Sequence, residues 1–141
     1  MIAERVLPLA GVHNFRDYGG YAVDGNGRLR DGMLWRSAHH EAASDEDLDA
    51  LDALGLDDLA ILFDDMRGDL PGLAASQARI VHWIAERTRA SRLIVCPSYY
   101  TDDPILDRVF GQRPENYLEV LGKALDPDIE VFWTGEEVCS R

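Results

Sequence analysis

Short apolar runs alternate with amphipathic stretches along most of the chain. The runs at 59–63 and 92–96 are bounded by charged residues or proline, which is typical of strands covered on both faces, as in a parallel sheet. A third run lies at 129–133, and apolar residues recur at helical spacing over 74–89 and 117–125. This alternation predicts parallel strands joined by right-handed helical crossovers.

The first part of the chain has a different pattern, with closely spaced glycines. Turn signals at 18–21 and 24–27 separate short mixed strands, and we expect a β-hairpin around 24–27. Residues 32–37 are expected to form another strand. Ser44 is a good N-cap followed by three acidic residues, and Gly55 suits a helix stop, so a helix is predicted between them.

These elements predict an α/β fold with about four mostly parallel strands, helical crossovers and an N-terminal β-hairpin. A short helix is also expected near 105–110, within a long polar loop. The 141 residues match one ordinary domain but not a closed eight-stranded barrel, which needs about 250 residues. We therefore expect a single α/β domain, built as a partial barrel or a small three-layer sandwich.

The composition narrows the classes of partner. The net charge of −12 repels nucleic acid and anionic membranes. No apolar run approaches the roughly 20 residues of a membrane helix, and the first residues lack the pattern of a signal peptide. Two cysteines do not form a disulfide framework. We expect a cytoplasmic protein that binds neither nucleic acid nor membrane.

Candidate chemistry is predicted at the carboxyl edge of the sheet, where active sites of parallel α/β proteins collect. Loops beginning near residues 64, 97 and 134 are expected to share this edge. Asp64 and Asp65 end the first strand, and paired acids suit glycoside cleavage, in which one protonates the leaving oxygen and another stabilises developing positive charge. A plain surface turn is the commoner structure for such a pair, and the residues alone leave both open.

The same acids allow a second chemistry. Asp69, Asp102 and Asp103 could join Asp64 and Asp65 in binding Mg²⁺, although acidic loops are more often simply solvated. No metal site and no cofactor are assigned. Because an unpaired strand edge invites pairing, a homodimer through the sheet edge is a further expectation.

Several motifs follow one another in residues 56–141: LFDDM at 62–66, LIVCPSYY at 93–100, YL at 117–118, LG at 121–122 and IEVFWTG at 129–135. In order and spacing they closely resemble glycoside hydrolase family 84, the β-N-acetylglucosaminidases that include O-GlcNAcase. The family's catalytic domain is a full barrel, and its sugar-binding glycine and lysine are not recognisable in the preceding sequence.

This resemblance implies a substrate-assisted retaining mechanism on a glycan that contains N-acetylglucosamine. The first acid of the pair, Asp64, would orient and polarise the 2-acetamido group, which acts as the nucleophile. The second, Asp65, would be the general acid/base. Tyr100 matches the active-site tyrosine of the family and is the expected substrate-binding residue. The matching motif at 133–135 is expected to be mainly structural.

The first part of the chain carries other motifs: VHNFRDYGGY at 12–21, LRDGMLWRS at 29–37 and the helix expected from 44 to 55. Over about residues 7–56 they resemble the start of a bacterial tyrosine-phosphatase family. The catalytic loop of that family is a cysteine, five residues and an arginine. Asp102 stands six residues after Cys96, and Cys139 lies two residues from the last position. Cys-dependent phosphatase activity is therefore expected to be excluded.

The two resemblances together predict a chimera, with a phosphatase-like segment at 1–56 and a glycosidase-like half-barrel segment at 57–141. The favoured function is an α/β scaffold that carries the acid pair of a β-N-acetylglucosaminidase, with little or no turnover by the isolated chain. Two alternatives stay open. One is an active β-N-acetylglucosaminidase completed by oligomerisation, and the other is a metal-dependent phosphohydrolase.

Overall fold

The structure is a computed structural model that describes residues 5–139. The chain divides into two compact units, one ending at Leu56 and the other beginning at Asp57. This border lies where the sequence motifs change from one resemblance to the other. Within the described residues, no helix is both long and apolar enough to cross a membrane.

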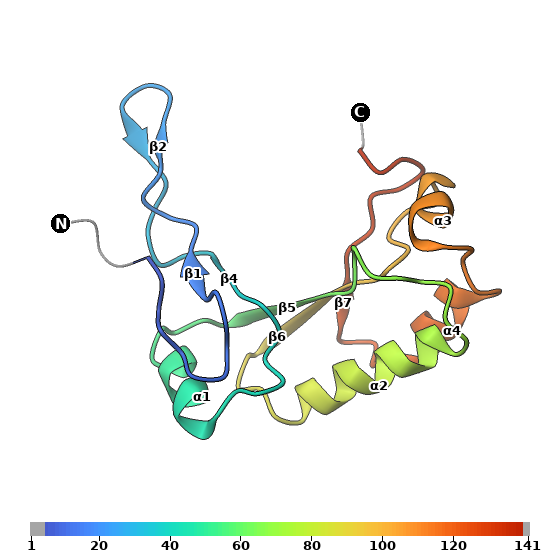
Figure 1. The fold of residues 1–141 in the computed structure, drawn as a ribbon, viewed down its shortest axis with the longest axis horizontal. Helices are drawn as coiled ribbons and strands as arrows, with labels where there is room; N and C mark the ends of the chain where they lie inside the picture. Colours follow the sequence, from blue (N-terminus) through green and yellow to red (C-terminus); the bar gives the residue numbers. More distant parts are fainter. Residues whose placement is uncertain (1–4, 140–141) are drawn as a thin grey trace. The chain divides into compact units, whose positions relative to one another are not determined.

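Over residues 5–56, the first unit contains two small antiparallel strand pairs and one helix (Figure 1). Its elements are β1 (Arg16–Asp17), β2 (Ala22–Val23), β3 (Gly27–Arg28), β4 (Trp35–Arg36) and α1 (Asp45–Asp52). Strands β2 and β3 form the hairpin predicted around 24–27. Its turn places Gly25 and Asn26 at positive φ, which suits the twist of a tight hairpin.

Strand β4 differs from the sequence prediction. The strand expected over 32–37 forms only at Trp35 and Arg36, and it pairs antiparallel with β1 instead of joining a parallel sheet. The Trp35 ring stacks on Phe15, with 4.9 Å between ring centroids, so packing holds this short strand in place. The parallel sheet therefore has three strands, not four.

Helix α1 begins where the sequence predicts. Ser44 and Asp47 form a reciprocal capping box, in which each side chain accepts the backbone N–H of the other residue. The Asp47 carboxylate also accepts the N–H groups of Ala10 and Gly11, at 2.8 and 2.7 Å. Asp47 therefore ties an earlier loop to the helix. Gly55, at φ 66°, follows the helix end, as predicted.

The second unit is a parallel sheet with helical crossovers, in the strand order β5-β6-β7 (Figure 1). Its elements are β5 (Asp58–Leu62), α2 (Leu73–Ala85), β6 (Arg92–Cys96), α3 (Ile105–Phe110), α4 (Tyr117–Ala124) and β7 (Glu130–Val131). Each corresponds to a predicted element, although α2 ends four residues early and β7 is short. In register, Leu62 stands opposite Cys96, and Val95 opposite Val131.

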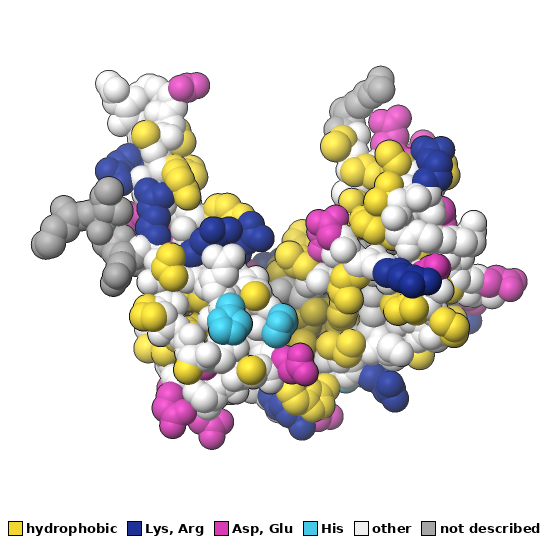
Figure 2. Space-filling view, in the orientation of Figure 1, with side chains coloured by type: hydrophobic (Ala, Val, Ile, Leu, Met, Phe, Trp, Pro, Cys, Tyr) yellow, Lys and Arg dark blue, Asp and Glu magenta, His cyan; other side chains and the backbone are white. Residues whose placement is uncertain are grey.

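Helices α2 and α4 pack together along the sheet, and the core lies between them and its strands (Figure 1). Val81 of α2 and Val95 of β6 are fully buried; burying such a side chain stabilises by about 1.5–3 kcal/mol. Strand β5 alternates between half-buried and exposed residues, and Leu62 is 58% exposed. The expectation that this apolar run is covered on both faces is therefore wrong. Apolar side chains consequently reach the surface of this unit (Figure 2).

Candidate active site

Hydrogen bonds join the loops that follow β5, β6 and β7 at the carboxyl edge of the sheet. Phe63 donates its backbone N–H to the Cys96 carbonyl at 2.8 Å. The Ser98 hydroxyl donates to the Phe63 carbonyl at 2.7 Å, and the Thr134 N–H donates to the Tyr100 carbonyl at 3.0 Å. The predicted meeting of three loops at this edge is confirmed.

The predicted acid pair comes directly after β5. Asp64 is half-buried, whereas Asp65 is exposed and has a left-handed backbone, with φ 58°. A non-glycine residue in that conformation costs about 1 kcal/mol, and such positions cluster at functional sites. The chain therefore turns sharply at the second acid.

Tyr100 and Cys96 lie near these carboxylates. Burial, followed by the negative charge of Asp64, raises the pKa of the Tyr100 phenol. Burial, followed by the charges of Asp64 and Asp65, raises the pKa of the Cys96 thiol to about 11. Asp64 and Asp65 follow β5 and Tyr100 follows β6, its parallel neighbour, so the three residues stand at the same edge of the sheet. Their catalytic and binding roles stay predictions.

A buried polar cluster beside this edge was not predicted. It consists of Gln77 from α2, Ser98 from the loop after β6 and Tyr117 from α4, and each is at most 2% exposed. Burial raises the pKa of Tyr117 to about 12, so this phenol stays protonated at neutral pH. One signal could have revealed the cluster, because Gln77 is a polar residue three positions after Ala74 on the apolar stripe of α2.

The acids considered for Mg²⁺ have other partners. Asp69 forms an ion pair with Arg67, and the Asp103 carboxylate accepts the N–H of Ile105 at the start of α3, at 2.9 Å. Across residues 5–139, no group of three or more His, Cys, Asp or Glu side chains is arranged to hold a metal ion. The geometry of this part of the chain gives the metal-dependent alternative no support.

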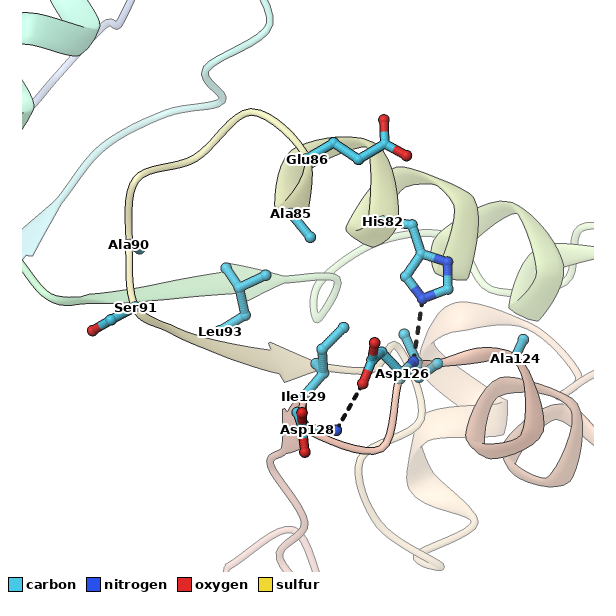
Figure 3. Close-up of a pocket in the computed structure, with 11 residues that line it drawn as sticks. His82, Ala85, Glu86, Ala90, Ser91, Leu93, Ala124, Asp126, Asp128 and Ile129 are labelled. Atoms are coloured by element: carbon cyan, nitrogen blue, oxygen red, sulfur yellow. Dashed lines mark hydrogen bonds between the residues drawn. The ribbon is translucent and has the colours of Figure 1, made fainter.

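A groove of about 610 Å³ lies at the opposite end of the sheet, near the amino ends of β6 and β7 (Figure 3). His82 projects from α2 toward its far wall, where the Asp126 N–H donates to the His82 Nε2 at 3.2 Å. The other lining residues are Ala85, Glu86, Ala90, Ser91, Leu93, Ala124, Leu125, Asp128 and Ile129. None of the predicted site residues belongs to this groove.

Comparison with known proteins identifies phosphatase relatives. The family described as the tyrosine phosphatase family matches residues 7–68. A protein of Cupriavidus necator named "Putative tyrosine-protein phosphatase" is 40% identical over 116 residues, covering 77% of this chain and 42% of that protein. The chain therefore spans less than half the length of this curated relative. The family match also continues past residue 56, where the sequence analysis ended the phosphatase-like segment.

Among solved structures, an O-GlcNAc hydrolase mutant of Thermobaculum terrenum matches with a TM-score of 0.47 and 30% identity. The match covers 69% of this chain and 23% of that chain. Both kinds of protein that the sequence motifs resemble thus occur among the matches.

The phosphatase matches leave the predicted exclusion of Cys-dependent phosphatase activity without support. A catalytic Cys-(five residues)-Arg loop does not occur in these 141 residues. However, 42% of the relative is too small a share for that absence to decide the chemistry of the whole protein.

Proposed function

We propose that residues 57–141 carry the acid pair of a substrate-assisted β-N-acetylglucosaminidase and bind the N-acetylglucosamine unit of a glycan, with little or no turnover by the chain alone. The hydrogen bond from the Ser98 hydroxyl to the Phe63 carbonyl carries this proposal, because it joins the loop that leads into Asp64 and Asp65 to the loop that carries Tyr100. Their place at the carboxyl edge of a parallel sheet supports it further.

The environments of the two acids fit different roles. Asp64 is half-buried, which suits a carboxylate that holds the 2-acetamido N–H while the acetamido oxygen bonds to the anomeric carbon. Asp65 is exposed, which suits an acid that protonates the leaving oxygen as its bond to that carbon breaks. Asp65 then takes a proton from the water that opens the ring intermediate.

Low turnover follows from the openness of this edge. Leu62, two residues before the acid pair, is 58% exposed, and Phe132 after β7 is 48% exposed. Water around the site screens its charges, and a sugar held from few sides is poorly oriented. Orientation contributes several kcal/mol to catalysis, so binding is expected to survive better than hydrolysis.

The test combines calorimetric titration of an N-acetylglucosamine-derived thiazoline with an assay on an aryl N-acetyl-β-glucosaminide. We expect Asp64→Ala to abolish thiazoline binding and Asp65→Asn to abolish residual hydrolysis while binding is kept. Asp128→Asn, at the far end of the sheet, is the matched control and should change neither. An unaltered protein that neither binds the thiazoline nor cleaves the glycoside would refute the proposal.

The alternative, an enzyme completed by oligomerisation, makes a separate prediction. Hydrolysis per chain would rise with protein concentration, in parallel with the fraction of oligomer measured by light scattering. A specific activity that is constant across that range would exclude it.

Phosphatase activity is a second candidate, favoured by the 40% identity to the Cupriavidus protein. Within the described site, Cys96 is a poor nucleophile, because a thiol with a pKa of about 11 holds little thiolate at neutral pH. Hydrolysis of p-nitrophenyl phosphate that is lost in Cys96→Ser would nevertheless establish this candidate. Absence of hydrolysis in the unaltered protein would reject it for this chain.

A further inference from the structure

We propose that Gln77, Ser98 and Tyr117 form a positioning network that fixes Asp64 relative to Tyr100. The importance of this network for catalysis rests on the proposed function. Whether the network holds Asp64 in place can be tested without a substrate. None of the three residues is proposed to touch the sugar, so they are positioning residues.

The network reaches the acid pair through the backbone. The carbonyl of Phe63 belongs to the peptide group that joins Phe63 to Asp64, and it accepts the Ser98 hydroxyl at 2.7 Å. On its other side, Phe63 donates its own N–H to the Cys96 carbonyl at 2.8 Å. These two bonds anchor the chain entering Asp64 to the loop that carries Tyr100, two residues after Ser98.

The three side chains close a ring of hydrogen bonds. The Gln77 amide donates to the Ser98 hydroxyl at 2.8 Å, the Ser98 N–H donates to the Tyr117 hydroxyl at 3.1 Å, and the Tyr117 hydroxyl donates to the Gln77 carbonyl at 2.5 Å. The Ser98 hydroxyl has a single proton, and the ring leaves that proton directed at the Phe63 carbonyl. Helices α2 and α4 thereby determine where the end of β5 is held.

A purely structural role explains this arrangement less well. Apolar side chains of similar shape could fill the same core at similar stability, since a hydrogen bond adds little net free energy over apolar packing. The ring instead directs its remaining donor to the peptide before Asp64. Downstream, Asp65 is held in a left-handed conformation that the chain would leave if its anchor were lost.

The thiol of Cys96 provides the readout, because the charges of Asp64 and Asp65 add to burial in raising its pKa. In a Cys139→Ser background, the pH dependence of iodoacetamide alkylation reports the pKa of Cys96 alone. We expect Ser98→Ala to lower this pKa and give severalfold faster alkylation at pH 8, since one pKa unit changes the thiolate fraction about tenfold. The Tyr100 phenol, titrated by NMR, should shift in the same direction.

Three further variants complete the experiment. Asp64→Asn calibrates the effect of losing the charge itself. Tyr117→Phe keeps the aromatic side chain and removes the hydroxyl that accepts the Ser98 N–H and donates to Gln77. This variant is the test if Ser98→Ala does not fold. Leu125→Ala, in the core at the C-terminal end of α4 and eight residues beyond Tyr117, should lower stability without changing either pKa.

Unchanged Cys96 and Tyr100 pKa values in folded Ser98→Ala and Tyr117→Phe, with a lowered Cys96 pKa in Asp64→Asn, would overturn the positioning role. An unchanged Cys96 pKa in Asp64→Asn would overturn the geometry on which it depends. Because these titrations contain no sugar, failure of the unaltered protein to bind the thiazoline would reject the proposed function separately.

Discussion

Asp65 lies in a conformation that most side chains avoid. Its φ of 58° is tolerated by Asn and Asp but not by β-branched residues. We predict that Asp65→Asn changes the free energy of unfolding by less than about 0.5 kcal/mol, whereas Asp65→Val lowers it by about 1–2 kcal/mol. Urea denaturation followed by circular dichroism measures both; equal stability of the two variants would contradict the assigned backbone.

Asp47 is predicted to make the stability of the first unit depend on pH. Its pKa lies below the ordinary 3.8 because the Ser44 N–H and then the Gly11 N–H donate to the carboxylate. A carboxyl group with a lowered folded pKa stabilises above its unfolded pKa, and that contribution is lost as pH falls through the folded pKa. Between pH 6 and pH 3, the urea midpoint should therefore fall further in the unaltered protein than in Asp47→Asn. An equal fall of the urea midpoint in both proteins would contradict this role of Asp47.

Two glycines of the second unit are predicted to respond oppositely to alanine. A Cβ at Gly68 would lie 2.3 Å from the hydroxyl of buried Tyr99, whereas a Cβ at Gly122 of α4 would meet no atom within 4 Å. Gly68→Ala should lower the free energy of unfolding by about 1–3 kcal/mol through overpacking. Gly122→Ala should raise it by up to about 1 kcal/mol through helix propensity. Thermal unfolding compares the two variants. An unchanged or higher melting temperature in Gly68→Ala would show that the loop around Gly68 relaxes, and a lower one in Gly122→Ala would contradict the effect of helix propensity.

At the level of elements, local signals predicted helix α1 of the first unit and strands β5 and β6 of the second. Ser44 marked the start of α1 through its capping chemistry, and bounded apolar runs marked β5 and β6. The antiparallel partner of Trp35–Arg36 was missed, because pairing with β1 depends on residues far apart in the sequence. Gln77 was missed because a single polar residue in an apolar stripe has no visible partner until α2 and α4 meet.

At the scale of the whole molecule, we propose that the chain forms a homodimer through a sheet edge. In the described residues, β5 and β7 each have one strand neighbour and form the edges of the sheet, and an edge strand is a template for pairing with another chain. Light scattering across a concentration series is expected to show a shift toward twice the mass of 15.8 kDa. A proline replacing Ala60 in β5 should weaken this shift, whereas an unchanged monomer mass at high concentration would reject the dimer.

The strand order β5-β6-β7 limits how such a partner could serve the acid pair. A two-fold axis through β5 would run the two strands antiparallel, so the amino ends of the partner's strands would face Asp64 and Asp65. That dimer covers the β5 edge, but it places no loops from the carboxyl ends of the partner's strands beside Asp64 and Asp65. Only head-to-tail association, with β5 of one copy beside β7 of the next in parallel, would align all carboxyl ends along one rim. The symmetry of an oligomer would therefore reveal whether it can complete the site or merely cover its flank.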